Sequence, residues 1–371
     1  MNFSISKKHF VEALSIASRA ISPSSPLASL HSIKLEVMED MLKITASDSN
    51  ISILININKS EENKLTIEET GEILFDSKYI VDMIRKIDSE TVEVETVDGY
   101  LTRISGGSVN FEINGFNTHD YPVINFDYDQ PSFTINSDEL KLLISQTCFA
   151  TSDKETKPVL TGLNMRCVGN EMTCVATDSY RMAQKKITID NNSDFNITVP
   201  AKALNEVAKI LPSDKDIDVF IFNMKIMFKI EDIFIQALLI EGSYPETTRL
   251  IPNNFNYELV VDARDILGSI DRASLIKNDG VSIIKMSLSQ DEIIVSSKSN
   301  EIGLTENITP VSYEGNDLRV SFKVPYVYDA VRALNAFQIK FQFVGEMKPF
   351  IIKSVDDDSV LQLVLPIRTY N

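Results

Sequence analysis

Alternating strand patterns that lead directly into helical patterns recur three times along the chain. The first such unit occupies residues 3–14, 133–144 and 259–270. A second unit occupies residues 73–84, 197–208 and 320–331. The copies keep their order and lie about 125 residues apart, which chance matches between strand and helix segments would not do. The sequence therefore predicts three similar domains.

Each third also carries a hairpin pattern between its two units and ends in alternating strands. The hairpins are expected at Ile33–Ala46, Leu163–Ala176 and Ile283–Ser297. Antiparallel strands with two helices per third indicate α+β domains rather than βαβ units with a parallel sheet. The helices are expected at residues 7–20, 76–87, 137–149, 200–211, 262–277 and 323–335. The domains are predicted to span residues 1–127, 128–252 and 253–371.

Composition is that of a folded protein, with 43% hydrophobic and 24% charged residues in a chain of 371. The longest apolar stretch, Ile233–Ile240, is far shorter than the roughly 20 residues that cross a bilayer. The N-terminus has neither the apolar core nor the cleavage site of a signal peptide. We expect a cytoplasmic protein without membrane contact.

No residue pattern indicates catalysis or a cofactor. Phosphate-binding, dinucleotide-binding, zinc-protease and nucleophile-elbow motifs are absent from the sequence, and the three histidines lie far apart in it. Asp48 and Asp178 occupy equivalent positions in two repeats, where a shared turn role is favoured over a catalytic carboxylate pair. We therefore predict a protein that is not an enzyme and needs no cofactor or metal.

Three cysteines without CxxC spacing argue against both a disulfide framework and a zinc site. Cys167 and Cys174 flank a Gly-Asn turn, and hairpin pairing would set Cys167 against Met172 and Cys174 against Met165. Buried free thiols that do not face each other are predicted.

Four short motifs carry a family resemblance that covers essentially the whole chain. They are Leu160-Thr-Gly-Leu163, Val175-Ala-Thr-Asp-Ser-Tyr-Arg-Met-Ala183, Glu241-Gly-Ser-Tyr-Pro245 with Arg249, and Leu365-Pro-Ile-Arg368. With these motifs the chain resembles the bacterial DNA polymerase III beta subunits, the sliding clamps. The resemblance implies a head-to-tail homodimeric ring of three-domain subunits, with antiparallel sheets outside and two helices per domain lining a pore. Such a ring encircles duplex DNA and tethers the replicative polymerase.

The same resemblance implies three sets of functional residues. A peptide-binding pocket between the second and third domains is implied for Leu160, Thr177, Tyr180, Arg181, Met182, Pro245, Arg249, Leu250, Leu365, Pro366, Ile367 and Arg368. DNA contact is implied for Lys7, Lys8, Arg19, Lys78, Arg85, Lys86, Lys154, Lys157, Lys202 and Lys209. The dimer interface is implied for Phe111 and Ile113 of the first domain against Leu275 and Ile276 of the third. The implied partners are the DNA polymerase III catalytic subunit, the clamp loader and other replication and repair proteins with a clamp-binding motif.

Departures from the family pattern concern loops and the chain end. The segment Ile21–Leu27 lacks the Arg that the family usually carries there, so its DNA contact is not carried over. Tyr370 and Asn371 extend past the usual end. The apolar segment Leu365–Ile367 lies where a chain would otherwise fray, which a docked tail that walls a groove would explain.

Charge and geometry both bear on the ring. The chain carries 53 acidic and 36 basic residues, for a net charge of -17, whereas the predicted helices carry slightly more basic than acidic residues. Helices that line a pore would then suit phosphates, without any signature of base recognition. Six helices side by side in a circle leave a hole of ~7 Å and twelve leave ~24 Å. A duplex is roughly 20 Å across, so a ring would need two chains.

The sequence leaves two alternatives open. One is an adaptor of the same fold that binds peptides without encircling DNA, which the acidic total and the loop without Arg motivate. The other is a hydrolase or transferase with a site assembled from distant residues, because absent motifs do not exclude it.

Overall fold

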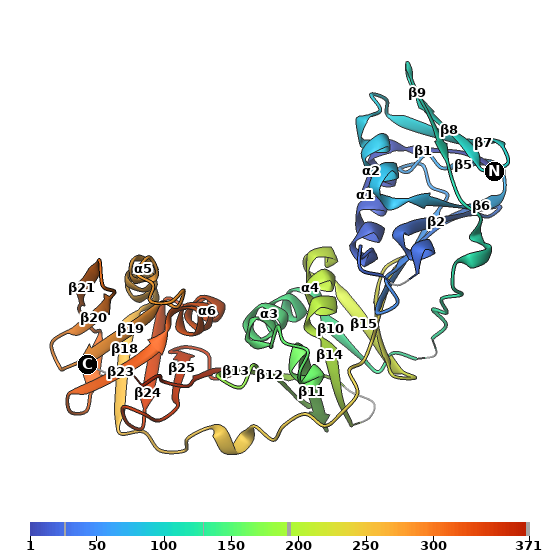
Figure 1. The fold of residues 1–371 in the computed structure, drawn as a ribbon. Helices are drawn as coiled ribbons and strands as arrows, with labels where there is room; N and C mark the ends of the chain where they lie inside the picture. The colour runs from blue at the N-terminus through green and yellow to red at the C-terminus, as the bar shows by residue number, and fades with distance from the viewer. Residues whose placement is uncertain (26, 129, 191–193, 369–371) are drawn as a thin grey trace. The chain divides into compact units, whose positions relative to one another are not determined.

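The computed structural model describes residues 1–25, 27–128, 130–190 and 194–368. The chain forms two compact units, one of residues 1–138 with 206–239 and the other of residues 139–205 with 240–371. The predicted repeat is visible as three successions of strand, helix, strands, strand, helix and strands (Figure 1).

The elements of the first repeat are β1 (Asn2–Ser6), α1 (Lys7–Ala17), β2 (Ser32–Val37), β3 (Met41–Ser47), β4 (Ile51–Asn58), β5 (Thr66–Glu69), β6 (Gly71–Asp76), α2 (Ser77–Lys86), β7 (Thr91–Asp98), β8 (Leu101–Gly106) and β9 (Val109–Asn114). Those of the second are β10 (Phe133–Asn136), α3 (Ser137–Thr147), β11 (Gly162–Val168), β12 (Glu171–Thr177), β13 (Arg181–Thr188), β14 (Phe195–Pro200), α4 (Ala201–Ile210), β15 (Asp216–Phe222), β16 (Lys225–Ile230) and β17 (Ile233–Leu238).

The elements of the third repeat are β18 (Tyr257–Asp262), α5 (Ala263–Ser274), β19 (Ile283–Leu288), β20 (Ile293–Lys298), β21 (Gly303–Ile308), β22 (Ser312–Glu314), β23 (Leu318–Lys323), α6 (Val324–Leu334), β24 (Gln338–Phe343), β25 (Phe350–Ser354) and β26 (Val360–Val364). The six helices match the predicted segments closely. The three predicted hairpins are confirmed as β2 with β3, β11 with β12 and β19 with β20.

Local chemistry explains where the helices begin and end. The Asp76 carboxylate accepts a hydrogen bond from the Lys78 amide at 2.8 Å and so caps α2. Pro325 lies in the first turn of α6, where its missing N–H costs nothing. That helix ends at Asn335, whose left-handed backbone is tolerated by a short polar side chain.

The first unit contains a five-stranded sheet in the order β5-β1-β7-β8-β9 and an eight-stranded sheet in the order β10-β15-β16-β17-β4-β3-β2-β6. Helices α1 and α2 lie side by side (Figure 1), and α1 contacts strands of both sheets. It buries Phe10, Ala13, Leu14 and Ala17, a spacing that follows one face of a helix.

The second unit contains a nine-stranded sheet in the order β14-β11-β12-β13-β26-β25-β24-β18-β22 and a four-stranded sheet in the order β21-β20-β19-β23. Helices α5 and α6 lie side by side there (Figure 1). A cluster of fully buried aromatic rings, Phe322, Phe341, Phe343 and Phe350, packs in the core beneath them.

Two strand pairings join repeats to one another. Strand β4 of the first repeat pairs antiparallel with β17 of the second, and β13 of the second pairs in the same way with β26 of the third. Each long sheet therefore crosses a junction between repeats through backbone hydrogen bonds.

The cysteine prediction is confirmed. Cys167 is opposite Met172 and Cys174 is opposite Met165, and all three cysteines are buried and outside any disulfide. The predicted boundaries of the three domains stay predictions, as the two compact units divide the second repeat between them.

Candidate functional site

The turn that follows β12 is built like the turn that follows β3. The Asp178 carboxylate accepts hydrogen bonds from the amides of Tyr180 and Arg181, and Asp48 accepts from Asn50 and Ile51. Each turn also holds a serine with φ near +80°. The predicted turn role of the two aspartates is therefore confirmed.

Arg181 begins β13 and is held from several sides. Its Nε donates to Asp178 Oδ2 at 3.1 Å, Nη1 to Asp329 Oδ2 at 2.6 Å and Nη2 to the Phe149 carbonyl at 2.7 Å. The guanidinium also lies over the rings of Phe149 and Tyr326. Because each nitrogen has a partner in the chain, Arg181 stabilises this region from within rather than offering free donors.

Tyr180 is more than half exposed and lies next to α6. Its ring stacks on Tyr326, with centroids 6.2 Å apart and an interplanar angle of 15°. Lys323 places its ammonium 5.5 Å from the centroid of each ring. Burial raises the pKa of the Tyr326 phenol. The result is an aromatic surface bordered by a cation.

The segment Leu365–Ile367, which follows β26, is docked on its own chain rather than frayed. The Leu365 amide donates to the Tyr180 carbonyl at 2.9 Å, and the Ile367 amide donates to the Ser321 carbonyl at 2.7 Å. Leu365, Pro366 and Ile367 are half-buried, and Arg368 is exposed. Tyr370 and Asn371 lie outside the described residues.

A small apolar cluster lies beside this segment. Its buried members are Val175, Met182, Ile351, Leu361 and Leu363, against which Tyr244, Ile251, Phe255 and Leu365 pack. Burial raises the pKa of the Tyr244 phenol.

The remaining members of the predicted peptide set divide by exposure. Leu160, Thr177 and Met182 are buried and support the region from inside, whereas Pro245, Arg249 and Leu250 are exposed. Sequence reasoning missed Lys323, Tyr326 and Asp329, which come from the last strand-to-helix unit. No local motif marks them, since only tertiary structure brings them beside Tyr180 and Arg181.

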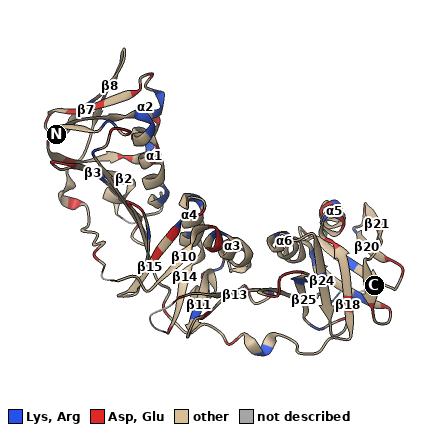
Figure 2. Ribbon diagram, turned by 180° about the vertical axis from the view of Figure 1, so that it is seen from behind, with Lys and Arg blue, Asp and Glu red and all other residues tan. Residues whose placement is uncertain are grey.

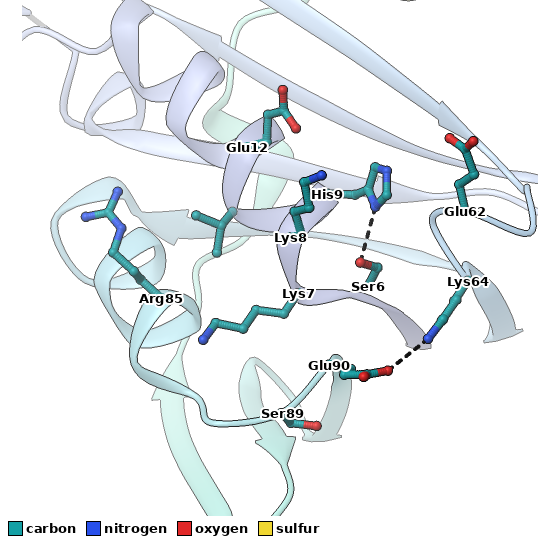
Figure 3. Close-up of a pocket in the computed structure, with 11 residues that line it drawn as sticks. Ser6, Lys7, Lys8, His9, Glu12, Glu62, Lys64, Arg85, Ser89 and Glu90 are labelled. Carbon is teal, nitrogen blue, oxygen red and sulfur yellow. Dashed lines mark hydrogen bonds and ion pairs between the residues drawn. The ribbon is translucent and has the colours of Figure 1, made fainter.

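Several predicted DNA-contacting residues gather at the first turn of α1. A cavity of about 620 Å³ there is lined by Lys7, Lys8 and Arg85, with Arg85 contributed by α2 (Figure 3). Glu90 also lines it and pairs with Lys64 at 3.1 Å, so the site is mixed in charge. Arg85 pairs with Asp82 at the same distance.

Each repeat contributes two helices, and among these pairs α1 and α2 carry the largest excess of basic over acidic residues. Figure 2 shows basic residues on both of them. Lys7, Lys8, Lys78, Arg85 and Lys86 outnumber their two acidic residues, Glu12 and Asp82. A surface of this kind attracts phosphates through screened, long-range electrostatics.

The other predicted DNA-contacting residues are all exposed: Arg19, Lys154, Lys157, Lys202 and Lys209. Glu206 pairs with both Lys209, at 2.7 Å, and Arg19, at 3.3 Å. The charges of Lys209 and Arg19 are therefore partly offset.

The predicted interface residues lie on strand β9 and just after helix α5. Phe111 and Ile113 share one face of β9, which is the edge strand of its sheet. Leu275 is 77% exposed just after α5, whereas Ile276 is only 5% exposed. Of the last two, only Leu275 offers apolar surface to another molecule.

Within the described residues, no group of three His, Cys, Asp or Glu side chains could hold a metal ion. A search of the same residues for a helix long and apolar enough to span a membrane also found none.

Family models of the DNA polymerase III beta subunit match three consecutive parts of the chain. The N-terminal domain model matches residues 1–125, the central domain model residues 134–246 and the C-terminal domain model residues 248–368. The chain is 38% identical over 376 residues to the beta sliding clamp of Staphylococcus epidermidis, with all of both chains covered.

Solved structures give the same picture. The DNA polymerase sliding clamp of Bacillus subtilis matches with a TM-score of 0.96 at 35% identity, covering 100% of both chains. The DNA polymerase III beta chain of Streptococcus pneumoniae matches with a TM-score of 0.95 at 29% identity, covering 99% of this chain and 100% of the other.

Proposed function

Because this chain belongs to the DNA polymerase III beta subunit family and is a DNA sliding clamp, we propose that two copies close head to tail into a ring around duplex DNA. The ring then slides while a surface on each copy holds partner proteins. Topological linkage replaces tight binding, so no enzymatic step by this chain is needed.

The strand pairings between repeats are the main support for the proposed ring. In the junctions within the chain, β4 pairs with β17 and β13 with β26. The strand equivalent to β4 and β13 in the third repeat is β21, and the strand equivalent to β17 and β26 in the first repeat is β9. Both β21 and β9 stand at the edges of their sheets. Pairing of β21 of one copy with β9 of another would repeat the junction that joins the repeats within the chain. It would also give hydrogen-bond partners to the backbone groups at both sheet edges.

Side chains near these edges support the same closure. Phe111 and Ile113 present one apolar face of β9, and Leu275 is exposed after α5. We propose that these three residues form the apolar centre of the interface and that buried Ile276 supports it from behind.

Two copies also give a hole that is wide enough for a DNA duplex. Twelve helices leave a hole of ~24 Å and six leave ~7 Å, so one chain alone cannot enclose a duplex. The proposed DNA contacts are the exposed basic residues on and beside the helices, which act without base recognition. Light scattering should give twice the 41.6 kDa of one chain, and a monomer at micromolar concentration would contradict the ring.

We propose that the region around the docked C-terminal segment binds short peptides of the polymerase catalytic subunit, the clamp loader and other clamp-binding proteins. Leu250, Tyr180 and the segment Leu365–Ile367 supply partly exposed apolar surface there. Arg249 and Arg368 are exposed and could receive carbonyl or carboxylate groups. Arg181 positions the Tyr180 turn through its own bonds.

Deleting residues 365–371 should abolish binding of a labelled polymerase-tail peptide, measured by fluorescence anisotropy. Removing only Tyr370 and Asn371 is the matched control and should leave the affinity unchanged. Light scattering checks that both variants remain dimers. Equal peptide affinity of the two variants would place the peptide site elsewhere.

A further inference from the structure

We propose that a second peptide-binding pocket lies at the junction of the first and second repeats, where it takes a side-chain carboxamide. This inference rests on the proposed peptide site beside Leu365, of which it is the internal-repeat counterpart. A cavity of about 220 Å³ is found there, lined by Leu27, Ser47, Ser49, Asn50, Ser52, Pro122, Val123, Ile124, Lys225, Gln236, Ala237 and Leu238.

The two junctions have the same construction. Ser47, Ser52 and Gln236 form a row of cross-strand neighbours on β3, β4 and β17. Thr177, Met182 and Leu363 form the equivalent row on β12, β13 and β26. Their neighbours correspond as well, because Tyr121-Pro122 matches Tyr244-Pro245 in sequence, and Leu238 stands where Leu365 stands.

The turns beside the two rows share their hydrogen bonds. Ser47 Oγ donates to the Ile51 carbonyl and accepts from the Ser49 amide. Thr177 Oγ1 donates to the Arg181 carbonyl and accepts from the Ser179 amide. The backbone framework around the proposed peptide site is thus repeated around the cavity.

What differs is the polarity of the row. Met182 and Leu363 are replaced by Ser52 and Gln236, and the Ser47 and Ser52 hydroxyls lie 2.8 Å apart. Gln236 is 3% exposed, and its buried Oε1 has no hydrogen-bond partner among the described residues. A buried acceptor without a partner is destabilising, so a ligand that donates an N–H to it gains affinity.

The residues that line the cavity favour some hydrogen-bond donors of a ligand over others. Leu27, Ile124 and Leu238 supply apolar walls, which suit an aliphatic residue beside the donor. Lys225 also lines the cavity and disfavours a cationic anchor. A carboxylate would set its oxygens against Gln236 Oε1. The carboxamide of Gln or Asn donates to that oxygen and remains neutral.

Size points to one side chain of a peptide rather than to a free metabolite. The cavity is smaller than the roughly 300 Å³ at which sites for drug-sized ligands begin. An extended segment with a single Gln or Asn between aliphatic residues fills such a space, and its flanking residues lie on the apolar rim.

The test is methyl NMR of the full-length protein with labelled Ile, Leu and Val, titrated with the peptide Ac-Leu-Gln-Leu-NH2. We expect saturable shifts at the Leu238 and Ile124 methyl groups, with millimolar affinity. The peptide Ac-Leu-Glu-Leu-NH2 should bind these positions about tenfold more weakly, because its carboxylate cannot donate. Absence of shifts at Leu238 and Ile124 would overturn the proposal.

Gln236→Leu introduces the residue type of the counterpart position and should abolish the shifts at Leu238 and Ile124. Ser52→Met, which copies Met182, serves as a second variant if the first does not fold, and thermal unfolding checks both. Undiminished binding in a folded variant would overturn the proposal. The Leu365 methyl groups, titrated separately with a polymerase-tail peptide, report the other site, so failure there without failure at Leu238 concerns the proposed function instead.

Discussion

Arg181 Nη1 donates to Asp329 Oδ2 at 2.6 Å, and this ion pair links the turn before β13 in the second repeat to α6 in the third. The same guanidinium holds Asp178 and the Phe149 carbonyl. An arginine that resembles a ligand-binding residue in sequence therefore bonds mainly to its own chain. This arrangement orients Tyr180, whose carbonyl in turn accepts from the Leu365 amide.

A double-mutant cycle of Arg181→Ala and Asp329→Ala should show a coupling energy of about 1 kcal/mol in urea unfolding. The value is modest because Asp329 is partly exposed, which weakens ion pairs. Arg85 and Asp82, an exposed pair on α2, provide the control cycle and should show less coupling. Additive effects at Arg181 and Asp329 would mean that the pair stabilises nothing.

Leu275→Ala should weaken the dimer by about 1–2 kcal/mol, which raises its dissociation constant about five- to thirtyfold. Sedimentation equilibrium measures this change. Phe337→Ala is the matched control, since Phe337 is also highly exposed in the third repeat but is not assigned to the interface. Ile276→Ala should instead lower the free energy of unfolding by about 2–4 kcal/mol, as expected for a buried residue. An unchanged dimer in Leu275→Ala would remove the interface assignment.

Changing Lys78, Lys202 and Lys209 together to Ala should slow loading onto primed circular DNA and reduce the salt dependence of the loading rate. The slope of the logarithm of the loading rate against the logarithm of the salt concentration should decrease in size by about 2. This decrease is smaller than the loss of three full phosphate contacts would give, because Glu206 already pairs with Lys209. Changing Lys59, Lys186 and Lys353 to Ala gives a control with the same loss of charge on strands and loops. If both triple variants keep the same slope, the helix lysines do not face DNA.

The Cys148 thiol should make stability fall at alkaline pH. Burial raises the pKa of this thiol from 9.0 to about 12 in the folded protein. The thiol of the unfolded chain then ionises first, so the stabilisation is complete below pH 9 and is lost as the pH rises toward 12. Its share of the loss is about 1.4 kcal/mol per pH unit in that window. Urea unfolding at pH 8 and pH 10 should show a steeper decline for the unchanged protein than for Cys148→Ala, and equal declines would contradict this origin.

Much of the fold follows from short-range patterns in the sequence. Strand-to-helix units recur with constant order, so the α-helices α1 to α6 and the three hairpins could be predicted, and the Gly-Asn turn set the register of Cys167 against Met172. The pairings β4 with β17 and β13 with β26 could not be predicted, because they join strands from different repeats. The alternation of polar and apolar residues in one strand does not determine which other strand pairs with it.

The candidate site was predicted less completely. The family motifs include Arg181 but not its partner Asp329, which is distant in the sequence and belongs to none of the motifs. Leu275 and Ile276 are adjacent and equally apolar, yet only packing decides that one is exposed and the other buried. The repeat of Thr177 at Ser47 was visible in sequence, whereas the cavity beside Ser47 depends on how β17 lies against β4.

Retention on DNA of defined topology distinguishes a ring that encircles DNA from a protein that only binds to its surface. The protein is loaded by its clamp loader onto a nicked circular plasmid, purified by gel filtration, and followed after the plasmid is cut once. A closed sliding ring should stay on the nicked circle and leave the linear DNA through its ends. Equal retention before and after cutting, or no retention on the circle, would contradict a ring around DNA and favour an adaptor that does not encircle it.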